Sequence, residues 1–160
     1  MSTPPGGRAD NLGYLLKHAW LRLAEATAPE LAPFGIDGRE LGVLTVLAGG
    51  DPLSQQEAAR RLDVDRTTMV ALIDGLEAKK LVERRPHPQD RRKNIVEPTA
   101  AGREVLRKAT RVTGDIERRF LAPLSEADAE RLKAWLRILN SAAPARSEPG
   151  PPPARSDRSR

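Results

Sequence analysis

Three consecutive residues, Arg66, Thr67 and Thr68, combine a positive charge with two hydroxyl groups directly after Asp65. Aspartate is a preferred helix N-cap, so these side chains are expected in the first turn of a helix. Arginine can donate two parallel hydrogen bonds to guanine, and threonine offers a donor, an acceptor and a methyl group. Val70 lies off the apolar stripe of this helix and has the shape to meet a thymine methyl. These residue types predict contacts with base edges in the major groove of DNA, although ordinary first-turn residues remain an alternative.

A second polar group comes just before this helix. The sequence Ser54-Gln55-Gln56-Glu57 has the form of a capping box, which opens a short helix that should run to about Leu62. The side chains of Ser54, Gln55 and Gln56, with the backbone N–H groups of the same turn, suit phosphate oxygens. We therefore expect this helix to contact the DNA backbone while the next helix contacts bases.

Basic residues are concentrated between positions 79 and 93. Two acidic residues, Glu83 and Asp90, stand against seven basic ones: Lys79, Lys80, Arg84, Arg85, Arg91, Arg92 and Lys93. The surplus in this window equals the net charge of the whole chain, +5. A local excess of this kind is typical of a phosphate-binding surface, with a solvated basic face as the alternative.

Within this window, Arg84, Arg91 and Arg92 are predicted DNA contacts. Arg91 and Arg92 fall in a turn-rich segment whose tip should lie over the minor groove, where the negative potential attracts arginine. We expect Asp90 to hold one of these arginines by a charge-assisted hydrogen bond, although aspartate is also common in plain turns.

The elements that must position these residues follow from apolar spacing and caps. A first helix should run from Asn11 until Pro29 and Pro33 end it. The further elements expected are a helix over 38–48 capped by Asp37, the helices 54–62 and 66–79 joined by a tight turn at Asp63–Val64, strands at 81–85 and 94–97, a long helix from Thr99 to Pro123, and a last helix from Ser125. Two capped helices and a basic hairpin form a winged helix-turn-helix. The predicted fold class is therefore mainly α with a small β-hairpin wing.

Composition excludes several classes of function. The 160 residues include no cysteine, which excludes disulfides, thiol catalysis and cysteine metal sites, and two histidines are too few for a zinc centre. We find no catalytic Ser/His/Asp arrangement and no glycine loop for phosphates, so we expect no enzyme, no metal and no cofactor. No apolar run approaches the roughly 20 residues of a membrane span. The beginning of the chain does not read as a signal peptide. These features predict a cytoplasmic, nucleoid-associated protein.

The run from Asp65 to Gly102 closely resembles the MarR family of bacterial regulators. The resemblance rests on the Asp90-x-Arg92 wing signature, the Leu-Val-Glu-Arg strand ending at Arg84, and the Thr99-x-x-Gly102 helix start. The segment Asn11-Leu-Gly-Tyr-Leu-Leu-Lys resembles the first helix of the family, and the likeness extends over roughly 11–142. The sequence departs from the family pattern at Ala71, at Lys80, where glycine is frequent, and at Pro98.

This resemblance implies a triangular homodimer whose first and last helices intertwine. It also implies a pseudo-palindromic operator and a repressor released by a small ligand. The expected organisation is a flexible lead (1–10), one MarR-like domain (11–143) and a disordered tail (144–160). Within the domain, the winged helix-turn-helix should cover about 38–98 and the dimerisation helices about 11–28 and 99–143.

Apolar residues of the terminal helices have two readings, a dimer seam or an intramolecular core. We favour the seam, for which the candidate residues are Leu12, Leu16, Leu23, Leu132, Trp135 and Leu139. The candidate ligand-pocket residues are Tyr14, His18, Trp20 and Phe34. For His18 and Trp20, structural packing is the competing interpretation.

The function predicted from the sequence is a dimeric, sequence-specific transcription regulator that responds to a ligand. The alternative is an architectural or ligand-independent DNA-binding protein. A sharp footprint with a large ratio of specific to non-specific affinity distinguishes the two, because an architectural protein coats any duplex evenly.

Overall fold

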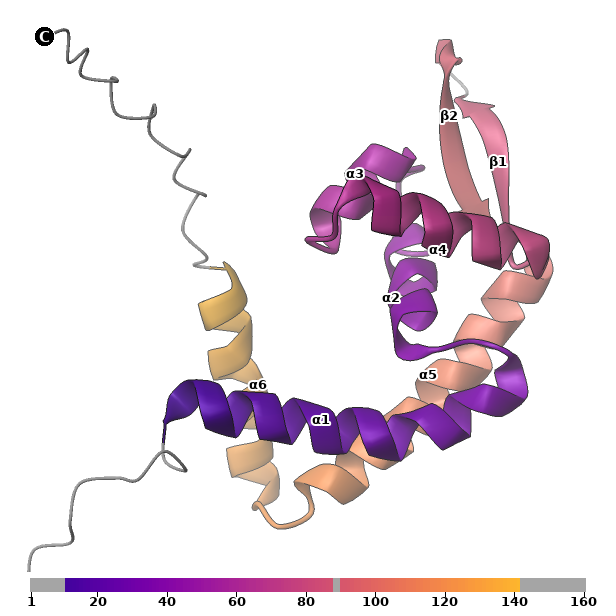
Figure 1. Ribbon diagram of the computed structural model, residues 1–160. Coiled ribbons are helices and arrows are strands. Elements are labelled where there is room, and N and C mark those ends of the chain that lie inside the picture. Colours follow the sequence, from indigo (N-terminus) through magenta and orange to yellow (C-terminus); the bar gives the residue numbers. More distant parts are fainter. Residues whose placement is uncertain (1–10, 88–89, 142–160) are drawn as a thin grey trace, which may run out of the picture. The chain divides into compact units, whose positions relative to one another are not determined.

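The computed structural model describes residues 11–87 and 90–141, and only the backbone of residues 90–93. The predicted flexible lead and the predicted disordered tail lie outside the described residues. The chain divides into two compact units, Met1–Phe120 and Leu121–Arg160. The elements, shown in Figure 1, are α1 (Leu12–Leu31), the 3₁₀ helix η2 (Ala32–Phe34), α2 (Gly38–Leu47), α3 (Gln55–Arg61), α4 (Arg66–Ala78), β1 (Val82–His87), β2 (Asp90–Pro98), α5 (Ala100–Leu121) and α6 (Glu126–Ser141). The prediction of a mainly helical fold with one β-hairpin is confirmed.

The predicted caps open the predicted helices. The carboxylate of Asp37 accepts a hydrogen bond from the backbone N–H of Glu40, and the Ser54 hydroxyl and Asp65 carboxylate do the same for α3 and α4. At Asp37 and Ser54 the glutamate three residues on also accepts from the cap backbone, which completes a capping box. These starts were predictable because a cap involves only neighbours in sequence.

The predicted end of α1 at Pro29 is wrong. The helix continues through Pro29 to Leu31, and the backbone N–H of Ala32 still donates to Ala28. Proline lacks the backbone donor and its ring crowds the carbonyl four residues back, but at Pro29 this affects only the last turn of α1. Leu31 is fully buried in the core, which accounts for the extra turn. Pro33 then lies in η2, and Gly35, which caps its C-terminal end, has a left-handed φ of 67°.

The core of the first unit joins α2, α4 and the hairpin. Its largest fully buried side chains include Leu31, Val43, Leu44, Met69, Ile73, Leu76, Val82 and Val96. The strands pair antiparallel, with Val82 opposite Pro98 and Arg85 opposite Ile95. An isolated bridge between Leu53 and Val96 also joins the segment before α3 to β2. In Figure 1, α3 and α4 lie side by side, with the hairpin beginning beside the end of α4. The helix-turn-helix and the hairpin therefore share one core.

An ion pair links α2 to the end of α4. Lys79 Nζ lies 2.6 Å and 2.8 Å from the two carboxylate oxygens of Glu40, a buried residue. The same carboxylate accepts from the backbone N–H of Asp37 in the α2 capping box. These contacts satisfy a buried charge that would otherwise be costly, and they connect the two helices across 39 positions of sequence.

Lys80, which follows the C-cap of α4, has a left-handed conformation with φ of 60°. The backbone N–H of Lys80 donates to Glu77 and that of Leu81 to Leu76, which together form a Schellman motif. Glycine is the residue best suited to this position, because a Cβ in the left-handed region is strained.

We therefore expect Lys80→Gly to raise the free energy of unfolding by about 0.5 to 1 kcal/mol. Chemical denaturation measures the change. Lys80→Ala is the matched control, since it removes the same charge but keeps the Cβ. Equal stability of the two variants would contradict a role for backbone strain.

No helix among the described residues is both long enough and apolar enough to cross a bilayer.

Candidate nucleic-acid interface

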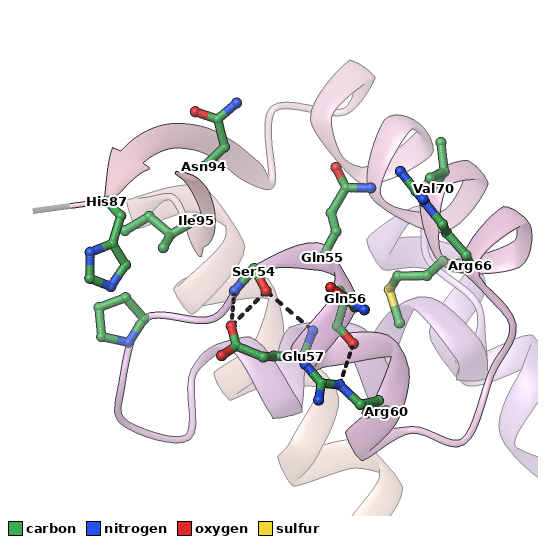
Figure 2. A pocket seen from close by; sticks show the side chains of 12 residues that line it. Ser54, Gln55, Gln56, Glu57, Arg60, Arg66, Val70, His87, Asn94 and Ile95 are labelled. Carbon is green, nitrogen blue, oxygen red and sulfur yellow. Dashed lines mark hydrogen bonds between the residues drawn. The ribbon is translucent and has the colours of Figure 1, made fainter. Parts of the chain in front are cut away.

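An open hollow of about 610 Å³ lies where α3, the start of α4 and both strands meet. Its lining residues are Pro52, Ser54, Gln55, Gln56, Glu57, Arg60, Arg66, Met69, Val70, His87, Asn94 and Ile95. Figure 2 shows the Gln55 side chain extending from α3 into this space, with Arg66 and Val70 on one side and Asn94 on the other. The fold therefore brings together five residues predicted to contact DNA, namely Ser54, Gln55, Gln56, Arg66 and Val70.

The first turn of α4 is held by its cap. The Asp65 carboxylate accepts from the backbone N–H of Thr68 at 2.9 Å and from the Thr68 hydroxyl at 2.5 Å. The Thr68 hydroxyl and then its backbone N–H hold the pKa of Asp65 below its ordinary value of 3.8. Because the hydroxyl proton of Thr68 is used by the cap, this side chain presents its oxygen as an acceptor and its methyl group. Arg66 and Thr67 are exposed on the same turn.

The first turn of α3 is also held by its own side chains. The Ser54 hydroxyl donates to Glu57 Oε2 at 2.6 Å, and the Ser54 backbone N–H donates to the same oxygen at 2.8 Å. The Ser54 hydroxyl therefore serves the cap, while the side chains of Gln55 and Gln56 line the hollow. Arg60, one turn along α3, places its Nε 3.5 Å from the backbone oxygen of Gln56.

Arg84 points to protein acceptors from two helices. Its Nε lies 3.1 Å from Gln55 Oε1, and its two terminal nitrogens form ion pairs with Glu77 and Asp74 of α4. Two carboxylates thus neutralise the guanidinium of Arg84 within the protein, and its contact with DNA stays a prediction. From β1, Arg84 joins the hairpin to both helices of the motif.

Ion pairs within the protein neutralise several of the basic residues between positions 79 and 93. Lys79 pairs with Glu40, Arg84 with Asp74 and Glu77, and Arg85 with Glu83. The side chains of Asp90, Arg91 and Arg92, predicted for the minor groove, lie outside the described residues. For the part of the run that the structure describes, intramolecular ion pairs are therefore the main use of the charge.

Four further polar residues of the hollow were not predicted to contact DNA: Glu57, Arg60, His87 and Asn94. Arg60 lies four positions after Gln56, so helical spacing alone could have placed it on the same face. His87 and Asn94 enter through the register of the hairpin, which residue types do not reveal.

A second pocket, of about 720 Å³, lies between α1 and α2. Its lining is mainly apolar and includes Trp20, Leu23, Ala24, Leu31 and Ile36, with Asp37 and Arg39 as charged members. Of the four predicted ligand-pocket residues, only Trp20 lines it. Tyr14 and His18 instead contact each other, with ring centroids 4.0 Å apart, on an exposed part of α1. Phe34 packs against the core.

Known proteins share this architecture. A family model described as the MarR family matches residues 34–93. A putative transcriptional regulatory protein for the hcr operon of Thauera aromatica is 30% identical over 135 residues, which cover 84% of this chain and 81% of that protein. This chain belongs to the MarR family. An HTH-type transcriptional repressor of Mycobacterium tuberculosis is also 30% identical over 137 residues, covering 84% of this chain and 99% of that one.

The MarR fold extends well beyond the segment that the family model matches. The solved structure of the transcriptional repressor CouR bound to a 23-mer DNA duplex superposes with a TM-score of 0.78 and 30% identity, covering 88% of this chain and 99% of CouR. The match at 34–93 contains α2 to the first part of β2, and so all the residues of the hollow except Asn94 and Ile95. This MarR-family chain is a winged helix-turn-helix transcription regulator that binds DNA.

Proposed function

We propose that this MarR-family protein binds a pseudo-palindromic operator as a homodimer and represses transcription until a small molecule releases it. The observation that carries the proposal is the hollow in which α3, α4 and the hairpin present Gln55, Gln56 and Arg66 on one open face. A solvent-open surface with amide and guanidinium donors suits the acceptors of phosphates and base edges.

Roles within this surface follow from position. Arg66 and Thr67, exposed in the first turn of α4, would meet base edges, and Thr68 would offer an acceptor or a methyl group. Gln55 and Gln56 would contact the backbone. The hairpin would carry Arg91 and Arg92 to the minor groove. Specificity would therefore reside in α4, and the other contacts would hold it in register.

Operator selection tests this proposal. Genomic fragments bound by the full-length protein are sequenced, and the enriched sites are footprinted. We expect sharp protection of two half-sites whose centres are about 34 Å apart, or a multiple of it. Even protection of every duplex would instead support the architectural alternative. Genes beside the operator would identify compounds to test for release of the protein from DNA.

Dimerisation is proposed from the exposed apolar side chains of the terminal helices. Leu12 is 64% exposed on α1, and Trp135 and Leu139 of α6 are 61% and 59% exposed. Leu16 is also exposed, while Leu23 and Leu132 are half-buried. Large exposed apolar residues at helical spacing are typical of surfaces that a partner covers.

Leu139→Arg is expected to convert the dimer to monomers at micromolar concentration, because the dimer seam would have to bury an unpaired charge. Sedimentation equilibrium measures the change. Asn140→Arg is the matched control, since it adds the same charge one residue further along α6. A dimer of undiminished affinity in Leu139→Arg would remove this residue from the seam.

For the effector, we propose the pocket between α1 and α2. Its apolar lining suits a ligand with an aromatic or aliphatic body, and Arg39 could pair with an acidic group. We further propose that the protein acts in the cytoplasm by binding alone, without catalysis. Among the described residues, no group of three or more histidine, aspartate or glutamate side chains could hold a metal ion.

A further inference from the structure

Arg84 and Gln55 come from different elements and meet at the edge of the proposed DNA interface. Arg84 lies on β1, and Gln55 is the first residue of α3. The Nε of Arg84 lies 3.1 Å from the Oε1 of Gln55. Arginine has only donors, so the atom of the Gln55 amide that faces it must be the oxygen. The contact with Arg84 thus determines which atom of the Gln55 amide is the oxygen and which is the nitrogen.

The position of Arg84 is itself fixed by α4. Its two terminal nitrogens form ion pairs with Asp74 and Glu77, so each nitrogen of the guanidinium has a protein acceptor. The planar group cannot rotate without breaking several charge-assisted hydrogen bonds at once. A reversed amide of Gln55 would also place its NH₂ against the Nε–H of Arg84, donor against donor.

We infer that Arg84 is a positioning residue that makes Gln55 a donor-only contact to DNA. With Oε1 turned to Arg84, the NH₂ group of Gln55 remains to contact the ligand of the hollow. That group can bind a phosphate oxygen or a base acceptor. The paired contact in which a glutamine reads adenine needs the amide oxygen as well, and the hydrogen bond from Arg84 turns that oxygen away from DNA. The inference rests on the proposed DNA interface. It adds that Gln55 acts there as a hydrogen-bond donor.

A double-mutant cycle on the full-length protein tests the inference, with operator affinity measured by fluorescence anisotropy. Gln55→Met removes the amide at similar size and is expected to weaken binding about tenfold. Arg84→Met should weaken binding by a similar factor in the wild-type background. In the Gln55→Met background, Arg84→Met should lower the operator affinity by less than about twofold, because the effect of Arg84 on binding passes through Gln55.

A direct contact of Arg84 with DNA predicts a different pattern. The two effects on affinity would then multiply, and Arg84→Met would lower the slope of log K against log salt by about 0.9 for each phosphate that Arg84 neutralises. Either result overturns the inference. Gln56→Met is the matched control, because Gln56 lines the same hollow on the next position of α3, and its effect should multiply with that of Arg84→Met.

A second readout needs no DNA. In the free protein, nuclear magnetic resonance relaxation of the Gln55 side-chain NH₂ should show a rigid group, and Arg84→Met should make it mobile. A mobile amide in the wild type would overturn the inference even if operator binding is normal. Failure of the wild type to select any operator would instead contradict the proposed function and leave this measurement unaffected.

Gln55→Glu covers the case in which Arg84→Met does not fold. A carboxylate at this position still accepts from Arg84, so the network persists, but it donates nothing. We expect Gln55→Glu to bind the operator at least as weakly as Gln55→Met, since the added negative charge also faces DNA. Wild-type affinity in Gln55→Glu would overturn the donor-only assignment.

Discussion

Replacing Arg66 by alanine is expected to weaken operator binding about tenfold for each half-site, and so about a hundredfold for a dimer on both half-sites. Arg66 is exposed in the first turn of α4 and lines the hollow beside Val70. A bidentate contact between arginine and guanine provides about 1 to 3 kcal/mol of discrimination, and 1.4 kcal/mol corresponds to tenfold. Anisotropy titrations on the selected operator measure the change in affinity.

The pattern across operator variants identifies what Arg66 contacts. If Arg66 contacts a base, Arg66→Ala should relax the base preference at one position of each half-site. If Arg66 contacts a phosphate, the substitution should weaken binding to all sequences alike. Arg61→Ala is the matched control, because Arg61 is also exposed but lies outside the hollow. Equal weakening in the two variants would show that Arg66 contributes only general positive charge.

Gly102→Ala is expected to destabilise the fold by about 3 kcal/mol or more, which lowers the melting temperature by about 10 °C. A Cβ at position 102 would lie 1.9 Å from the carbonyl oxygen of Leu81. That oxygen accepts from the backbone N–H of Thr99, so it cannot easily move away. The Thr99 hydroxyl also accepts from the Gly102 N–H and donates to the Lys80 carbonyl, which fixes the start of α5 against the end of α4.

Gly114→Ala provides the control within the same helix. Nothing lies within 4 Å of a Cβ built at Gly114, so alanine there should stabilise α5 by about 0.5 to 1 kcal/mol. Calorimetry on both variants separates close approach from helix propensity. An unchanged melting temperature in Gly102→Ala would contradict the contact with Leu81.

Local signals in the sequence predicted the elements well. The caps at Asp37, Ser54 and Asp65 depend on backbone groups three residues away, and the stripe of Met69, Ile73 and Leu76 depends only on helical period. The same reasoning failed at Pro29, where burial of Leu31 carries α1 past a proline. Burial in a core involves distant residues, which no local rule includes.

In the candidate site, too, some features followed from local sequence and others only from the tertiary structure. Sequence alone determined that polar and basic side chains lie at the first turns of α3 and α4, because residue type and cap position are local properties. Only the tertiary structure decided which basic residues have ion-pair partners within the protein. Asp74 and Glu77 take up Arg84, and Glu40 takes up Lys79 across 39 positions of sequence. An ion pair depends on where two chain segments meet in space, so a basic residue counted for the ligand can belong to the fold.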